Sequence, residues 1–168
     1  MKVEFLPCGD CALSVQFGER IERSLNERVI QIKKAVDAAG LDGLVETVSS
    51  YRALMVHYDP LRTSQAKLID EISPFLDQTA DAPTGGTHWR IPVCYTPEFA
   101  PDLEYVASCA DMATERVIEI HTTTTHYVYM IGFAPGQPHM GDLPEELNIP
   151  RRKDPRATVE KGSIVTAT

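Results

Sequence analysis

The chain has 168 residues, of which 43% are hydrophobic, so it can bury one ordinary core or two small ones. Its formal net charge of -8 repels phosphate backbones, which excludes non-specific binding to DNA or RNA. No run approaches the roughly 18 apolar residues of a membrane-spanning helix, and Pro7 and Asp10 interrupt the N-terminus before a signal-peptide core could form. We therefore expect a cytoplasmic protein without contact to a membrane.

The cysteines Cys8, Cys11, Cys94 and Cys109 are too few and too irregularly spaced for a disulfide framework, and we expect free thiols. Cys8 and Cys11 could share a metal ion or act as a dithiol, because two positions separate them. The alternative is a tight turn at Gly9 with Cys11 as a small core residue. We expect no metal site, because a structural zinc needs a second ligand pair.

The first 78 residues are predicted to form one compact α/β domain. Alternating apolar residues predict strands, and apolar residues at helical spacing predict helices. The first helix should end near Gly40, which is typical of a helix C-terminus. Helices on one face of a mainly antiparallel sheet fit this order best. The predicted elements are strands at 3–5, 13–17, 44–48 and 52–58, and helices at 21–36 and 64–76.

Residues 79–87 lack large apolar side chains and carry Pro83, Gly85 and Gly86, which is typical of a linker. A second domain is expected at 88–168.

Within this second domain, alternation predicts an edge strand at 89–95, and Asp102 and Thr114 are predicted to cap helices at 103–109 and 115–121. The four threonines that follow favour extended chain, and the apolar run at 126–133 predicts a strand buried on both faces.

Two distinctive segments follow that strand. Glycines and prolines from Gly132 to Gly141 predict a rigid, irregular loop, and such loops at strand ends often carry functional sites. Residues 151–161 then hold five basic and two acidic side chains in a chain that is otherwise strongly negative. Their arginines could bind an anionic ligand or partner through forked hydrogen bonds, or pair with acidic residues of the same chain.

These segments resemble the PxpB/KipI family, which comprises the B-type subunits of 5-oxoprolinase and the allophanate hydrolase subunit 1 proteins. The family pattern is G-F-x-P-G-F-P-Y-L, followed by P-R-x-x-P-R-x-x-V-P-x-G-S-V. Shorter matches occur in the same order along nearly the whole chain, for example 6–10, 56–60 and 91–95. The chain matches the pattern at Gly132, Phe133, Pro135, Gly136, Pro138, Pro150, Arg151, Pro155, Arg156, Val159, Gly162 and Ser163.

The resemblance implies an α+β protein with an N-terminal α/β sandwich domain and a cyclophilin-like β-barrel domain. It also implies an accessory subunit of an ATP-dependent 5-oxoprolinase, which opens 5-oxoproline to glutamate. The implied partners are a PxpC-type protein (allophanate hydrolase subunit 2) and a PxpA-type protein (LamB/YcsF). No nucleotide-binding loop is recognisable, so ATP is expected only in the assembled complex, and this chain is expected to be inactive alone.

Site residues follow from the same segments. His139 is the candidate catalytic residue, because an imidazole exchanges protons near neutral pH. Arg151 and Arg156 are the candidates for holding a carboxylate of the substrate or of a partner. The wall beside them is predicted to consist of Gly132, Phe133, Pro135 and Gly136. His121 and His126 are expected to lie at a helix end and on a strand surface.

The chain departs from the family pattern in three places. Gln137 and His139 replace aromatic residues, and Glu160 replaces a proline. Family members also continue past Gly-Ser-Val with further strands, whereas this chain stops at Thr168. We therefore expect the second domain to be incomplete, rearranged or completed by another chain, which includes a homo-oligomer.

Other functions stay open at this point. A KipI-like inhibitor would bind a sensor histidine kinase through the cyclophilin-like domain and the basic loop. A subunit of an allophanate- or urea-related amide hydrolase is a further alternative.

Overall fold

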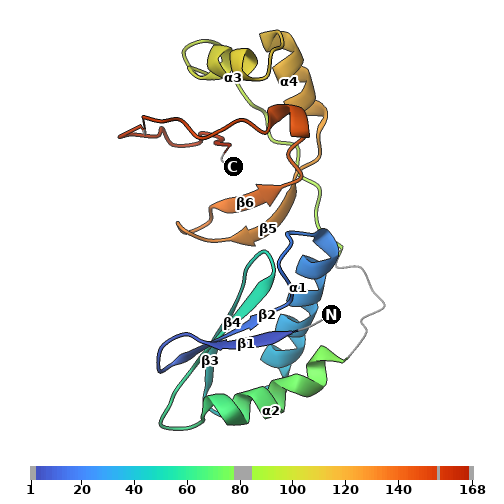
Figure 1. Ribbon diagram of the computed structural model, residues 1–168, viewed down its shortest axis with the longest axis vertical. Helices are drawn as coiled ribbons and strands as arrows, with labels where there is room; N and C mark the ends of the chain where they lie inside the picture. The colour runs from blue at the N-terminus through green and yellow to red at the C-terminus, as the bar shows by residue number, and fades with distance from the viewer. Residues whose placement is uncertain (1–2, 78–84, 155, 167–168) are drawn as a thin grey trace. The chain divides into compact units, whose positions relative to one another are not determined.

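The computed structural model describes residues 3–77, 85–154 and 156–166 (Figure 1). The chain divides into two compact units: the first holds Met1–His88 and Tyr127–Met140, and the second holds Trp89–His126 and Gly141–Thr168. The chain therefore leaves the first unit, returns to it for one hairpin and leaves it again. The predicted linker at 79–87 lies mostly outside the described residues.

The first unit is built on a four-stranded antiparallel sheet of β1 (Glu4–Pro7), β2 (Ala12–Gln16), β3 (Leu44–Ser49) and β4 (Ala53–Tyr58), in the order β1-β2-β4-β3. The register sets Leu13 opposite Val56 and Val15 opposite Leu54, so that large apolar side chains share one face. A β-bulge interrupts β3 between Leu44 and Glu46.

Two helices, α1 (Arg23–Ala39) and α2 (Gln65–Leu76), cover this apolar face (Figure 1). Gly40 has a left-handed φ of 58° and ends α1 as predicted. The Ser64 hydroxyl accepts a hydrogen bond from the Lys67 backbone N–H and caps α2. The prediction of helices on one face of an antiparallel sheet is confirmed. The buried apolar core consists of Leu13, Val15, Phe17, Leu25, Val29, Ile32, Val36, Leu54, Val56, Tyr58, Leu68 and Ile72.

A hairpin of β5 (Tyr127–Ile131) and β6 (Pro138–Gly141) completes the first unit. The predicted strand at 126–133 is confirmed in position, but its burial on both faces is wrong: within β5 only Tyr129 is buried. Its neighbours Val128 and Ile131 are 44% and 58% exposed. The reason is that β5 belongs to a sheet of only two strands and packs on α1 along one side.

The second unit contains α3 (Leu103–Cys109), α4 (Thr114–Thr123) and the short 3-10 helix η1 (Glu145–Leu147). Its small apolar core consists of Ala107, Val117, Ile120 and Leu147. Asp102 stands at the N-cap position of α3 but makes no capping hydrogen bond, and α4 begins at Thr114 with Ala113 as its N-cap. The two helices are confirmed, and Asp102 is confirmed as the N-cap residue of α3 but without a side-chain capping bond, whereas the predicted cap at Thr114 is wrong.

The threonine run is partly helical, which corrects the expectation of extended chain. The hydroxyl groups of Thr122 and Thr123 donate to the carbonyls of Ile118 and Glu119, one turn earlier in α4. These bonds satisfy the two hydroxyl groups within the last turn of the helix.

The predicted strand at 89–95 is also wrong, because no residue of this segment lies in a strand. Trp89 and Ile91 are 76% and 71% exposed, and an alternating pattern forms a strand only when another strand accepts its hydrogen bonds. Helices and strands together confirm the α+β class. Among the described residues of the second unit, only Gly141, the last residue of β6, lies in a strand, so the cyclophilin-like barrel stays a prediction.

No helix within the described part of the chain is both long enough and apolar enough to span a bilayer.

Candidate functional site

The turn between β5 and β6 is the segment that the sequence singles out. The Gly132 N–H donates to the Gln137 carbonyl over 3.0 Å, and the Gln137 N–H donates to the Ala134 carbonyl over 3.1 Å. Phe133 adopts a φ of 60° and Gly136 a φ of 79°. Positive φ is rare for a bulky residue and marks a backbone that its surroundings hold in place. The Phe133 ring is 97% exposed, so this turn presents an aromatic side chain to solvent.

His139 lies on β6 and makes two contacts inside the first unit. Its Nε2 atom is 3.3 Å from the Gly132 carbonyl oxygen, which requires the proton on Nε2 for a hydrogen bond. Its ring meets the Tyr51 ring edge to face, with the centroids 6.3 Å apart. His139 thus buttresses the turn, and its predicted catalytic role stays a prediction.

Asn26 ties the hairpin to α1 and to the loop between β3 and β4. Its side chain is fully buried, and its Nδ2 atom donates to the carbonyls of Ser50, Tyr51 and Tyr129 over 3.0, 3.2 and 3.0 Å. The Tyr127 hydroxyl donates to Asn26 Oδ1 over 3.3 Å. One amide therefore joins segments more than 100 positions apart in the sequence. Sequence reasoning missed it, because a single Asn on the apolar side of a helix is only a weak signal.

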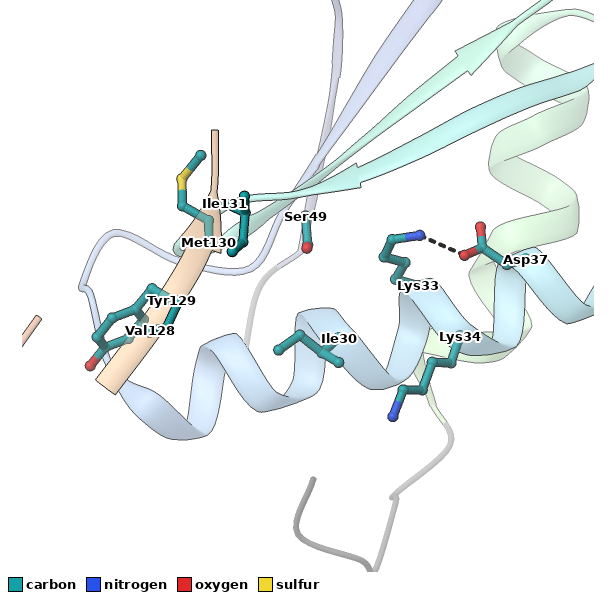
Figure 2. A pocket seen from close by; sticks show the side chains of 9 residues that line it. All are labelled: Ile30, Lys33, Lys34, Asp37, Ser49, Val128, Tyr129, Met130 and Ile131. Atoms are coloured by element: carbon teal, nitrogen blue, oxygen red, sulfur yellow. Dashed lines mark hydrogen bonds and ion pairs between the residues drawn. The ribbon is translucent and has the colours of Figure 1, made fainter. Parts of the chain in front are cut away.

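An open groove of about 460 Å³ runs between α1 and β5 in the first unit (Figure 2). Ile30, Val128 and Ile131 contribute apolar walls, and the Tyr129 backbone and ring lie at one side. Its polar groups come from α1 and from the end of β3, namely Lys33, Lys34, Asp37 and Ser49. The volume falls in the range of small-molecule sites, although the walls enclose little of it.

Two polar groups of this groove, Lys33 and Asp37, are bound to each other and to Thr47 of β3, which does not line the groove. Lys33 Nζ lies 2.6 Å from Asp37 Oδ2 and 3.0 Å from Thr47 Oγ1, and the Thr47 hydroxyl donates to Asp37 Oδ1 over 2.5 Å. Partial burial acts to raise the pKa of Asp37, but the hydrogen bonds from Lys33 and Thr47 outweigh it and lower the pKa. This closed triangle keeps the carboxylate ionised and anchors α1 to β3.

The other face of the sheet carries a second open groove of about 480 Å³. Ser14, Gln16, Met55 and His57 line it from β2 and β4, and Arg52 lies at its border. Arg52 is already engaged, because its guanidinium donates to the Gly18 carbonyl. This face is mostly uncharged, which is typical of the centre of a protein interface.

The basic segment of the second unit makes specific pairs. Arg152 and Arg156 both donate to the same oxygen of Asp102, Arg156 over 2.5 Å. The Arg152 guanidinium also lies over the Tyr105 ring, 5.6 Å from its centroid. Arg151 is exposed and makes no hydrogen bond or ion pair with another residue in the described part of the chain. Arg152 was predicted only as one of the arginines of the basic segment that could bind an anion, and it has a better-defined position than Arg151.

A second cluster lies around the C-terminal end of α4. The Tyr95 hydroxyl is hydrogen-bonded to His121 Nδ1, and the rings of His121 and His126 have centroids 5.5 Å apart. Burial lowers the pKa of His121, and the neighbouring His126 lowers it further, whereas burial raises the pKa of Tyr95. His121 lies in the last turn of α4, which confirms the predicted helix end. The predicted strand-surface position holds poorly for His126, since its Nε2 atom is buried without a hydrogen-bond partner among the described residues.

The cysteine segment forms the predicted turn. Gly9 has a φ of 69°, which confirms its role. All four thiols are free, as predicted, and Cys11 is exposed, so the expectation of a core position is wrong. Within residues 3–77, 85–154 and 156–166, no three His, Cys, Asp or Glu side chains are placed to hold a metal ion.

The predicted site residues fall into two groups. His139, Gly132, Phe133, Pro135 and Gly136 belong to the first unit, where the hairpin brings them together. Arg151 and Arg156 belong to the second unit, where Arg156 meets Asp102. A single site that combines both groups stays a prediction.

Comparisons with known proteins find relatives of the family that the sequence pattern resembles. The chain is 32% identical over 167 residues to the B-type subunit of 5-oxoprolinase from Bacillus subtilis, which covers 93% of this chain and 70% of that protein. It is 46% identical over 79 residues to the protein of the same name from Haemophilus influenzae, of which it covers 37%.

Solved structures give the same result for the fold. The structure of TTHA0988 matches 93% of this chain with a TM-score of 0.78 and 29% identity, and this chain covers 30% of it. Urea carboxylase of Kluyveromyces lactis matches 81% of this chain with a TM-score of 0.61 but only 16% identity, which supports the fold alone, and this chain covers 14% of it. The family model for the carboxyltransferase domain, subdomain C and D, matches residues 3–168. The chain belongs to this carboxyltransferase-domain family, subdomains C and D.

Proposed function

We propose that this chain is an accessory subunit of an ATP-dependent 5-oxoprolinase, acting with a PxpC-type and a PxpA-type partner. The observation that carries the proposal is the similarity to proteins named as the B-type subunit of 5-oxoprolinase, which for the Bacillus subtilis protein extends over 167 residues. The other two such proteins, from Haemophilus influenzae and Escherichia coli, are 46% and 42% identical over 79 and 75 residues.

The arrangement of side chains supports a shared site. In the described part of the chain, His139 contacts a backbone carbonyl and a tyrosine ring, and neither can serve as an activated nucleophile. A partner would supply the missing groups, and ATP would bind on another subunit. In this complex, His139 is the candidate for proton transfer, and Arg151 and Arg156 are the candidates for a carboxylate.

Phe133 is the candidate anchor for the PxpC-type partner. An aromatic ring that is 97% exposed on a backbone of fixed conformation loses little conformational entropy on binding, and buried aromatic anchors dominate many interfaces. The exposed apolar side chains Ile131 and Met140 of the same hairpin extend this surface. The hairpin is therefore the part of the first unit on which we expect the partner to bind.

The test is co-expression of this chain with both partners and measurement of ATP-dependent release of glutamate from 5-oxoproline. We expect activity only when all three proteins are present. Phe133→Ala should weaken binding to the PxpC-type partner by roughly five- to thirtyfold, which is the range for loss of an aromatic anchor.

Leu61→Ala is the matched control, because Leu61 is 94% exposed in the same unit but lies outside the hairpin. It should leave the affinity unchanged. Glutamate release at the full rate without this chain, together with failure to co-purify with either partner, would overturn the proposal.

A further inference from the structure

The pair Arg152 and Arg156 shares a single acceptor. Both guanidinium groups donate to Asp102 Oδ1, so two positive charges meet one negative charge and the cluster keeps a net charge of +1. The side chains of the two arginines are 44% and 40% exposed, and that of Asp102 is 38% exposed. Several N–H groups of the arginines therefore face solvent, because each guanidinium carries five donors.

Asp102 binds the two arginines and does not cap α3 with its side chain. It occupies the N-cap position of α3, where an aspartate normally accepts a hydrogen bond from the first turn, yet it makes no capping bond. The carboxylate is turned to the arginines instead. The Asp102 carboxylate therefore occupies the position beside the arginines that a carboxylate of another molecule would take.

Arg152 would stay in place without Asp102. Its guanidinium lies over the Tyr105 ring at 5.6 Å, and stacking of this kind orients an arginine independently of its anion. Arg152 is therefore pre-organised by a contact that an incoming anion need not break.

We propose that Arg152 and Arg156 form a carboxylate-binding site for an acidic segment of a partner protein, and that Asp102 is an internal competitor that occupies this site in the free chain. Neither groove described above includes these residues, and an exposed arginine pair suits a side chain presented by another protein. The exchange breaks the two bonds to Asp102 and forms two to the incoming carboxylate, which can accept a bidentate fork from arginine. The identity of the partner rests on the proposed function, whereas the existence of the anion site does not.

The test uses the full chain and a tetraglutamate peptide as the probe, with affinity measured by isothermal titration calorimetry at low and high salt. Asp102→Asn removes the competitor and keeps the shape, so we expect it to bind the peptide about two- to fivefold more tightly than the wild type. Arg156→Ala in the Asp102→Asn background should remove this gain. High salt should weaken the binding of all variants, because the site is exposed.

Arg116→Ala is a matched control, because Arg116 is an exposed arginine of the same unit that pairs with Glu119 and lies outside the cluster. It should bind the peptide as the wild type does. If Asp102 has only a structural role, Asp102→Asn should bind the peptide no more tightly than the wild type, and that result would overturn the site. Circular dichroism shows that each variant is folded.

The same variants distinguish this inference from the proposed function. If the wild type binds the PxpC-type partner but Asp102→Asn fails to bind tetraglutamate more tightly, the anion site is wrong and the complex stands. If the peptide results are as expected but no complex forms, the site stands and the proposed partner is wrong.

Discussion

At the residue scale, the buried amide of Asn26 joins the β5–β6 hairpin to α1 and to the loop between β3 and β4. Its Nδ2 atom, which carries two N–H groups, lies within hydrogen-bonding distance of three backbone carbonyls. Buried carbonyl groups without a donor destabilise a protein by about 1–3 kcal/mol each, although relaxation and water reduce the sum. A hydrophobic core explains why α1 packs on the sheet, whereas this amide explains why the hairpin packs where it does.

Asn26→Ala should therefore lower the free energy of unfolding by about 2–4 kcal/mol, because it removes the donor from one buried and two partly buried hydrogen bonds and creates a small cavity. Urea denaturation followed by circular dichroism measures the change. Lys34→Ala on the exposed face of the same helix is the control and should stay within about 0.5 kcal/mol of the wild type. Equal stability of Asn26→Ala and Lys34→Ala would show that the amide does not hold the hairpin.

His121 makes the second unit sensitive to acid. Its pKa is lowered in the folded chain by burial and by His126, so the unfolded chain binds more protons at mildly acidic pH. Stability rises with pH wherever the unfolded state binds more protons. The contribution of His121 is therefore complete above its unfolded pKa of about 6.5 and is lost as the pH falls toward the lower folded value.

We expect the wild type to lose more stability than His121→Gln between pH 7.5 and pH 5. Thermal unfolding at a series of pH values provides the comparison. Parallel curves for the two proteins would contradict the assignment, since they would mean that other groups cause the acid sensitivity.

At the scale of the element, the turn of the β5–β6 hairpin depends on backbone conformation and not on packing. Gly136 has a φ of 79°, and a Cβ atom added there would have nothing within 4 Å. A substitution would therefore meet no clash, and its cost would be that of placing an L-residue in the left-handed region. Gly85 has equally open surroundings but no positive φ.

Gly136→Ala should destabilise the hairpin by about 1–2 kcal/mol, which is the cost of the left-handed conformation for a residue with a Cβ atom. Gly85→Ala is the matched control and should be neutral or slightly stabilising, because it only restricts the unfolded chain. Amide hydrogen exchange of β5 and β6 reads out the local effect. Unchanged protection of the hairpin in Gly136→Ala would show that the turn can adopt another conformation without cost.

The elements also show where pattern reasoning succeeds. The strands of the first 77 residues were predictable, because β1 pairs with β2 and β3 with β4, which are neighbours in the sequence. The helices were predictable from the apolar stripe that each packs into the core. The segment 89–95 has the same alternation but no such neighbour, and it forms no strand. Likewise, β6 was missed, because Pro138 and Gly141 read as turn residues and only pairing with β5 makes this segment a strand.

At the scale of the whole molecule, the chain order does not follow the spatial units. Tyr127–Met140 belongs with the first 88 residues, although 38 residues of the second unit separate them. The contacts responsible are specific: Asn26 holds the Tyr129 carbonyl, and the Tyr51 ring lies 5.4 Å from that of Tyr129. Neither composition nor hydrophobic periodicity indicates that the chain returns to the first unit in this way.

Only part of the candidate site was predictable from the sequence. The glycines and prolines of the turn and the arginines of the basic segment were recognisable from residue type, because each residue type has its own conformational or charge preference. Their partners were not recognisable. Asp102 is 50 residues from Arg152, and Tyr51 is 88 residues from His139, so only folding shows that they meet.

The sequence by itself determined the sheet with helices on one face and the stiff turn, because these follow from local periodicity and from the φ preferences of glycine and proline, and its family resemblance implied the α+β class. Only the tertiary structure decided that Asn26 holds the hairpin, that β5 is mostly exposed and that Asp102 serves two arginines. Those facts depend on contacts between residues far apart in the chain, and no local pattern encodes which distant group will accept a hydrogen bond.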